Sequence, residues 1–260
     1  MSNRFNGRCS IPFILPSLLL FATASLAHPA LSQAPDSAGS RTIVTGLVTV
    51  TNNGISTIPS FSLGKAAAIF DVYITRNRFS LDPEVKWALD GKPWSFLFWG
   101  HFKLADGEKF RVILGAHPSV SFRTTTVSVN QTERDVIVAR RFLAGDIYPS
   151  YALSRYVNVG GYYLYLYGVE HDVVRHTHLL ALRSVLSSTP IVGGYFVQLY
   201  PQVYYLKSDA KDGYYFYSGL AVGRRNLPLL IGATANKVIQ TDVPGGEDFL
   251  WNVSITWVIR

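Results

Sequence analysis

The stretch from Phe249 to Arg260, FLWNVSITWVIR, alternates apolar and polar side chains with a period of two. Every odd position from Phe249 to Ile259 is apolar, and small polar residues such as Asn252 and Ser254 lie between them. Successive side chains on a strand point to opposite faces, so this pattern predicts a strand with one apolar and one polar face. Large aromatic residues near both ends of the apolar row are typical of the lipid-facing band of a transmembrane β-barrel.

The N-terminus carries the features of an exported protein. Residues 1–8 contain two arginines and no acid, and residues 11–26 are almost wholly apolar. Together with small residues at Ser25 and Ala27, this predicts a Sec signal peptide over residues 1–27. The uninterrupted apolar stretch is shorter than the ~20 residues of a spanning helix, which disfavours an N-terminal membrane anchor. The single cysteine, Cys9, would leave with the signal peptide, which excludes disulfides and cysteine chemistry in the mature chain.

From the remaining sequence we predict a flexible lead-in over residues 28–41 and one β domain over residues 42–260. Strand-like segments separated by turn signals follow one another, with no convincing helix between them. We expect twelve, at 42–50, 65–75, 79–89, 94–104, 109–129, 135–151, 156–169, 177–187, 195–207, 214–224, 229–240 and 249–259.

The links between these segments alternate in length. Links such as Arg76-Asn77 and Ser154-Arg155 are tight, whereas residues 51–64 and 241–248 are longer. Short periplasmic turns and longer extracellular loops are characteristic of outer-membrane barrels. The link at residues 90–93 is short for an extracellular loop and fits this scheme less well.

A secreted β-sandwich and a lipocalin-like barrel would also have alternating strands. The aromatic content of 15 Tyr, 15 Phe and 5 Trp, much of it near predicted strand ends, favours a membrane barrel with interfacial aromatic girdles. We therefore expect an all-β fold, a single antiparallel transmembrane β-barrel of about twelve strands in the outer membrane of a Gram-negative cell.

The charge of the chain limits its partners. Without residues 1–27, 22 Lys and Arg face 17 Asp and Glu, a net charge of about +5. The basic residues are scattered with no run longer than two, so the sequence shows neither a nucleic-acid stripe nor a polybasic lipid-binding segment. We expect outer-membrane lipids, the barrel-assembly machinery and small solutes as partners, and no nucleic acid and no cofactor.

Several stretches resemble a known group of proteins. They are GLVTVTNNGISTIPSFSLG at residues 46–64, KPWSFLFWGHFKL, GAHPSVSFRT, VARRFLAG and the C-terminal DFLWNVSITWVIR. Together they are similar to uncharacterised outer-membrane β-barrel proteins of Bacteroidota. The resemblance covers essentially the whole mature chain and implies a barrel without a known activity. Barrels of that group usually end on an aromatic residue, whereas this chain ends Ile259-Arg260.

Alternation also predicts which side chains line the lumen. Among the charged residues assigned inward, six cations face three anions, so an open channel should prefer anions modestly. A narrow small-solute channel or transport-related barrel is our leading hypothesis, and a structural or adhesive barrel acting through its loops is the alternative. The predicted lining residues are Lys86, Lys103, Arg111, His117, Ser119, Arg123, Arg183, Asp82 and Glu84, and the charge count also includes Lys65 and Asp71.

His117-Pro118-Ser119 resembles the His-x-Ser pair of outer-membrane phospholipases and lipid A deacylases. A spacing of two puts the imidazole and the hydroxyl on one face of a strand, where the base could activate the nucleophile. Asn130 could complete this set only if the strand folded back. Because His117 and Ser119 share their face with Arg111 and Arg123, we expect a polar lumen lining and no catalytic residue, and lipid hydrolysis stays a weaker alternative.

His171, His176 and His178, with Glu170 and Asp172, supply imidazole and carboxylate groups that zinc or copper would accept. The set straddles a predicted loop, and metal sites need ligands in a fixed arrangement. We therefore expect a solvated loop and no metal site.

Overall fold

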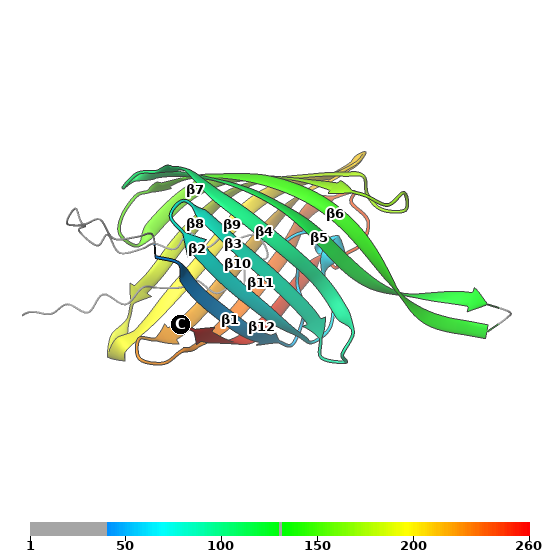
Figure 1. Ribbon diagram of the computed structural model, residues 1–260, viewed down its shortest axis with the longest axis horizontal. Coiled ribbons are helices and arrows are strands. Elements are labelled where there is room, and N and C mark those ends of the chain that lie inside the picture. The colour runs from blue at the N-terminus through cyan, green and yellow to red at the C-terminus, as the bar shows by residue number, and fades with distance from the viewer. Residues whose placement is uncertain (1–40, 130–131) are drawn as a thin grey trace, which may run out of the picture.

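The chain forms one closed antiparallel barrel (Figure 1). This computed structural model describes residues 41–129 and 132–260. The predicted signal peptide over residues 1–27 and all but the last residue of the predicted lead-in lie outside the described residues.

Twelve strands make up the barrel wall. Their bounds are close to the predicted segments and differ mainly at the ends, because hydrogen bonding continues into several turns. The strands are β1 (Ile43–Thr51), β2 (Ala67–Arg76), β3 (Phe79–Ala88), β4 (Pro93–Asp106), β5 (Phe110–Val129), β6 (Thr132–Ala152), β7 (Val157–Gly168), β8 (His176–Pro190), β9 (Tyr195–Ser208), β10 (Lys211–Arg224), β11 (Leu229–Thr241) and β12 (Phe249–Ile259).

Helical structure is confined to two short 3₁₀ turns in the described residues, η1 (Pro59–Phe61) and η2 (Val192–Gly194). Within residues 41–129 and 132–260, no helix is long and apolar enough to cross a membrane.

Each strand pairs with its neighbours in sequence, and β1 pairs with β12 to close the sheet. The closing register runs from Gly46 opposite Ile259 to Thr51 opposite Ser254. Closure leaves no unpaired edge around the wall, which is what a spanning sheet requires. The predicted fold class is confirmed.

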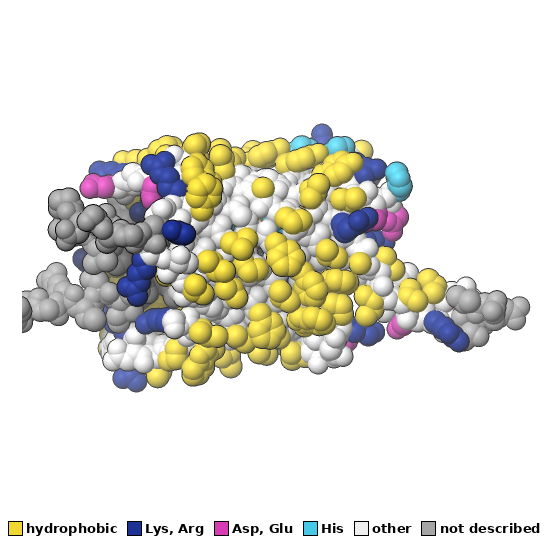
Figure 2. Space-filling view, viewed as in Figure 1, with side chains coloured by type: hydrophobic (Ala, Val, Ile, Leu, Met, Phe, Trp, Pro, Cys, Tyr) yellow, Lys and Arg dark blue, Asp and Glu magenta, His cyan; other side chains and the backbone are white. Residues whose placement is uncertain are grey.

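The two faces of β12 follow the predicted alternation. Val253 and Trp257 are 49% and 51% exposed on the outside, whereas Ser254 and Thr256 are 3% and 0% exposed inside the barrel. The same holds on β2, where Phe70 faces out and Asp71 is buried. The apolar faces therefore form the outer wall of the barrel (Figure 2).

The ends of the barrel differ. We call the end that carries residues 52–66, 89–92, 169–175, 209–210 and 242–248 the loop rim. The opposite end is the turn rim. It carries the start of β1, the end of β12 and residues 77–78, 107–109, 153–156, 191–194 and 225–228. The hairpin of β5 and β6 extends well beyond the loop rim (Figure 1).

Pro118 marks an irregular point in the wall. Pairing of β4 with β5 passes from Leu97 opposite Ser119 directly to Gly100 opposite Ala116. Proline has no N–H to donate, which accounts for the interruption at this position. On its other side β5 stays paired, with Pro118 opposite Leu143.

Candidate functional site

The connection after β1 does not project outward but turns into the barrel. Within this inner segment, residues 52–65, the side chains from Ile55 to Pro59 are buried, and Ile58 is only 1% exposed. Gly54 N donates to Lys65 O at 2.8 Å and Leu63 N to Gly54 O at 2.8 Å, so the segment is closed at its base. Gly54 also packs against Trp94, where a Cβ would lie 2.9 Å from the indole ring.

Side chains from the barrel wall bind the backbone carbonyls of the inner segment. Tyr204 Oη donates to Thr57 O at 2.6 Å, and Trp94 Nε1 donates to Phe61 O at 2.9 Å. Arg123 donates to Ser62 O at 2.9 Å and also to Ser60 O. A buried carbonyl without a donor is costly, so these bonds fix the segment inside the lumen. The sequence predicted an extracellular loop here and gave no sign of this inward path.

Aromatic side chains fill much of the remaining lumen. Arg183 lies over the rings of Tyr148 and Tyr162, with its guanidinium carbon 5.1 Å and 4.4 Å from their centroids. Tyr162 Oη donates to Asp146 Oδ2 at 2.9 Å, and Arg183 Nη2 donates to Gln202 Oε1 at 3.2 Å. The largest side chains almost completely removed from solvent are Trp94, Tyr148, Tyr162, Tyr200, Tyr215 and Tyr217.

Charged groups inside the barrel are paired. His101 Nδ1 lies 2.6 Å from Asp82 Oδ2, and the fully buried Lys86 ammonium forms an ion pair with Glu84. Lys86 also lies 4.9 Å from the centroid of the Trp94 ring. Removing one partner of a buried pair leaves an uncompensated charge, so both pairs are costly to break. The His101–Asp82 pair also joins β4 to β3, whereas Glu84 and Lys86 both lie on β3.

A tight packing point joins two of these groups. A Cβ on Gly115 would collide with the Asp146 carboxylate and lie 2.8 Å from His101 Nε2. Glycine at this position therefore lets Asp146 and His101 approach the same stretch of β5. Neither residue was singled out from the sequence. The signal that could have found His101 is the alternation of β4, where it falls on the same face as Trp99 and Lys103.

His117 and Ser119 are buried inside the barrel, with 3% and 9% exposure. The His117 ring packs against Trp99, with 3.8 Å between ring centroids, and it makes no hydrogen bond to Ser119. The arrangement lacks the contact by which a base activates a nucleophile. Asn130, the third residue of the hydrolase alternative, lies outside the described residues.

A small cavity of about 40 Å³ lies between the inner segment and the wall. Ser56 and Phe61 of the inner segment line it on one side, and His117, Ser119 and Phe142 belong to the wall on the other. Among the described residues, its lining is mostly apolar and includes no Lys, Arg, Asp or Glu side chain.

The residues that were predicted to line the lumen form three groups by location. Lys86, Glu84, His117, Ser119 and Arg183 are buried inside, where Asp82 also contacts His101. Arg123 binds the inner segment. Lys103 and Arg111 lie toward the turn rim, 3.6 Å and 3.1 Å from the carboxylate of Asp106.

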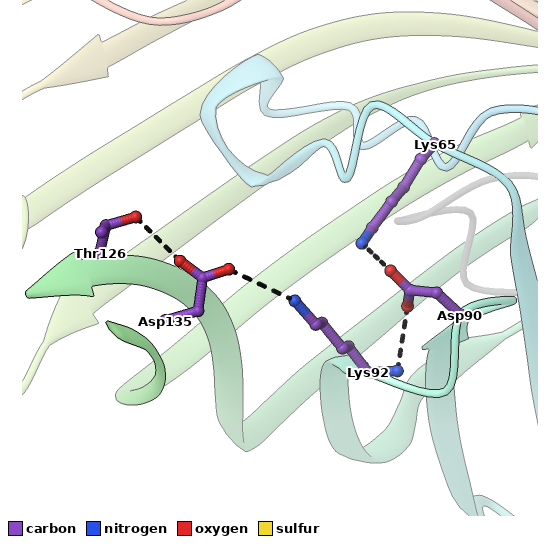
Figure 3. A network of polar contacts seen from close by, with 5 residues as sticks. All are labelled: Lys65, Asp90, Lys92, Thr126 and Asp135. Carbon is purple, nitrogen blue, oxygen red and sulfur yellow. Dashed lines mark hydrogen bonds and ion pairs between the residues drawn. The ribbon is translucent and has the colours of Figure 1, made fainter. Parts of the chain in front are cut away.

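At the loop rim a polar network joins three connections (Figure 3). Lys65, at the end of the inner segment, forms an ion pair with Asp90, whose other oxygen accepts from Lys92 N at 3.1 Å. The hydrogen bond from Lys65 lowers the pKa of the Asp90 carboxyl. Lys92 Nζ in turn lies 4.0 Å from Asp135 on the projecting hairpin.

The histidine-rich stretch near β8 is engaged in other contacts. His176 Nδ1 and His178 Nδ1 lie 2.8 Å and 2.9 Å from the hydroxyls of Tyr165 and Tyr163. Glu170 Oε1 accepts from Arg141 Nε at 2.7 Å, and this bond lowers the pKa of the Glu170 carboxyl. In residues 41–129 and 132–260, no three His, Cys, Asp or Glu side chains are grouped as metal ligands would be.

Comparisons with solved structures find outer-membrane proteins. LpxR from Salmonella typhimurium is 12% identical, with a TM-score of 0.47, and the match covers 82% of this chain and 99% of that one. An outer-membrane channel from Pseudomonas putida F1 is 9% identical, with a TM-score of 0.46, over 89% and 98% of the two chains. The β domain of the Bordetella autotransporter BrkA is 8% identical, with a TM-score of 0.45, over 84% and 99%.

No protein-family model and no curated protein sequence matches the chain. The structural neighbours are outer-membrane proteins of differing kinds, and at these identities the likeness carries no function. The link to a family of Bacteroidota stays a prediction.

Proposed function

We propose that this chain is an integral outer-membrane protein with a closed lumen that binds extracellular partners through the hairpin of β5 and β6. Placement in the membrane is supported by the outer wall, where residues such as Leu182 and Ile231 are 66% and 68% exposed. An apolar surface of this extent is not tolerated in water. The loop rim faces outward, because outer-membrane barrels keep their short turns in the periplasm.

The filled interior argues against free diffusion of solutes. The inner segment lies in the lumen near the loop rim, and the tyrosine and arginine side chains around Tyr162 and Arg183 are buried deeper inside. A twelve-stranded barrel has room for either a narrow pore or a plug, and the packing here supports the plug. This favours our alternative hypothesis, an adhesive barrel, over the narrow channel.

The projecting hairpin is the observation that carries the binding role. Pairing of β5 with β4 ends at Ser121, and pairing of β6 with β7 ends at Phe142. Beyond these points β5 and β6 pair only with each other, and Val136 and Ile137 are 37% and 49% exposed. Two open strand edges and exposed β-branched residues form a surface to which an extended segment of another protein can add as a strand.

The test compares cells that display the full chain with cells that display a variant in which an Asn-Gly turn replaces residues 124–137, so that the turn joins the paired residues Arg123 and Val138. Both proteins should fold, shown by heat-modifiable mobility in detergent gels. We expect the full chain to increase attachment to protein-coated surfaces and the shortened chain to lose the increase. Equal attachment by both would overturn the binding role, and recovery of either mature chain as a detergent-free monomer would overturn the membrane assignment.

A gated channel is the second candidate function, and the attachment of the inner segment favours it. The segment is held by side-chain bonds from Tyr204, Trp94 and Arg123 rather than by strand pairing with the wall. Such bonds contribute roughly 0.5–1.5 kcal/mol each, so a ligand or voltage could release them. Single-channel conductance of the combined Arg123→Gln and Trp94→Phe variant tests this function. If the segment is a gate, the variant should show open levels that the wild type lacks. A variant without conductance would exclude the gated channel.

A further inference from the structure

Basic side chains collect at the turn rim although they are scattered in the sequence. Ten Lys and Arg lie there, and the acidic residues at this rim in the described part of the chain are Asp106 and Glu108. The ten are Arg41, Arg76, Arg78, Lys103, Lys109, Arg111, Arg155, Arg224, Arg225 and Arg260. Figure 2 shows this as dark blue side chains gathered at the left end of the barrel.

The loop rim provides the contrast, because its charges balance. Ion pairs such as Arg140 with Asp172 and Arg141 with Glu170 neutralise several of them. Its cations are Lys65, Lys92, Arg123, Arg134, Arg140, Arg141, Arg175, Lys207, Lys211 and Lys237, and its anions are Asp90, Glu133, Asp135, Glu170, Asp172, Asp209, Asp212, Asp242, Glu247 and Asp248. The excess positive charge of the barrel is therefore concentrated at one end.

The cations of the turn rim surround the barrel instead of forming one patch. They come from the β2–β3, β4–β5, β6–β7 and β10–β11 connections and from the adjoining ends of β1 and β12. Lys103 and Arg111 contact Asp106, and the other eight are exposed. A compact acidic protein would meet only one sector of such a ring, whereas the surrounding lipid leaflet meets all of it.

Rings and aliphatic side chains lie beside these cations. The Arg155 guanidinium carbon is 4.5 Å from the centroid of Tyr156, and that of Arg224 is 5.6 Å from the centroid of Tyr195. Trp257, 51% exposed, lies on the outer wall near the same rim. A cation above an aromatic ring is the arrangement expected where a membrane protein meets lipid headgroups.

We infer that the turn rim binds anionic phospholipid headgroups in the leaflet around it. Guanidinium groups bind phosphate with charge-assisted and often bidentate hydrogen bonds. Each Lys or Arg held near an anionic lipid surface adds to the attraction, which salt weakens. The sequence showed no polybasic segment, because barrel closure brings together residues separated by up to the whole length of the described chain. The inference rests on the membrane placement proposed above and is independent of the adhesive role.

Trp257 provides a native reporter for the test. In a Trp87→Phe, Trp251→Phe background it is the one outward tryptophan of the described chain, because Trp94 and Trp99 are buried. The refolded protein is placed in zwitterionic vesicles to which brominated phosphatidylglycerol or brominated phosphatidylcholine is added, and quenching of Trp257 gives the relative affinity for the two lipids. A matched background keeps Trp251, near the loop rim, and replaces Trp257 with Phe.

We expect Trp257 to report a preference of roughly threefold or more for the anionic lipid, decreasing as salt increases. Combined Arg78→Gln, Arg155→Gln, Arg224→Gln and Arg225→Gln substitutions should abolish it. The same number of changes at the loop rim, Arg134→Gln, Lys207→Gln, Lys211→Gln and Lys237→Gln, should leave it intact. Trp251 should show no preference.

Two results would overturn the inference. One is equal quenching of Trp257 by both lipids, and the other is an equal loss of preference in the two Gln variants. If soluble polyglutamate bound the turn rim where the lipid showed no preference, the site would belong to an acidic macromolecule instead of the leaflet. Absence of quenching by either lipid would contradict the membrane placement itself, so the two failures are distinguishable.

Discussion

At the scale of single residues, the side of the wall and the depth in the membrane decide what a substitution costs. Val253 lies near the middle of β12 on the outer face, and Ile259 lies on the same face at the turn rim. We expect Val253→Arg to destabilise the barrel by about 2–4 kcal/mol and Ile259→Arg by about 0–1 kcal/mol. Denaturant unfolding in lipid vesicles measures both, and equal costs would mean that depth is assigned wrongly.

For residues that face the lumen, the cost of a substitution depends on the free space around the new side chain. A Cβ at Gly115 would collide with Asp146 and His101, whereas a Cβ at Gly100 would have its nearest neighbour, Ala116 O, at 3.8 Å. We therefore expect Gly115→Ala to cost about 1–3 kcal/mol. Gly100→Ala, in the neighbouring strand, is the matched control and should change the free energy of unfolding far less. Similar values for the two variants would show that Gly115 is not a tight packing point.

Alternation along a strand could predict the face of a residue but not its partners on other strands. Lys86 and His117 were placed in the lumen from their sequence parity alone, and both are buried there. The Lys86–Glu84 pair lies within β3, two residues apart on one face, so the alternation already brings these two side chains together. That His117 packs on Trp99 instead of bonding Ser119 depends on the register of β4 and β5. Register is set by closure of the whole sheet, which no single segment specifies.

At the scale of elements, the inner segment depends on a few wall side chains. Arg123→Gln combined with Trp94→Phe removes the donors to Ser62 O and Phe61 O. We expect amide hydrogen exchange over residues 54–64 to rise roughly tenfold or more, because the two substitutions together remove hydrogen bonds that contribute roughly 0.5–1.5 kcal/mol each. Arg134→Gln, on the hairpin away from the segment, should leave exchange unchanged. Equal protection in both variants would mean that other contacts hold the segment.

The loop between β7 and β8 should respond to acid. Bonding to Arg141 lowers the pKa of Glu170 below its ordinary value of 4.5. The charged carboxylate therefore stabilises the loop above pH 4.5, and this contribution is lost as the pH falls through the lowered pKa. We expect hydrogen exchange in residues 169–175 to rise in that acid range in the wild type. Glu170→Gln should show the faster exchange already at neutral pH, and an unchanged pH profile in this variant would exclude Glu170 as the titrating group.

Strands and turns were predictable as elements because each has a local signal, a period of two followed by turn residues. The inner segment was not. Its carbonyls are bonded by Tyr204, Trp94 and Arg123, which come from distant strands, and its own sequence, NNGISTIPSFSLG, is typical of any polar loop. Whether such a loop projects outward or folds inward depends on the lumen that receives it.

At the scale of the whole molecule, closure of the barrel does two things that the linear sequence hides. It fills the lumen from both the wall and the inner segment, and it separates charge between the rims. The cations that were predicted to line a pore therefore lie in different environments. Lys86 is paired inside the barrel, and Arg123 binds the inner segment. Lys103 and Arg111 contact Asp106 toward the turn rim.

The closed lumen is tested most directly by single-channel recording of the refolded wild-type protein in planar bilayers. Heat-modifiable mobility of the same sample establishes that the barrel is folded. We expect no stable open level at moderate voltage, because the inner segment and the buried side chains around Tyr162 and Arg183 occupy the lumen. Reproducible conductance steps from the folded wild-type protein would contradict the account.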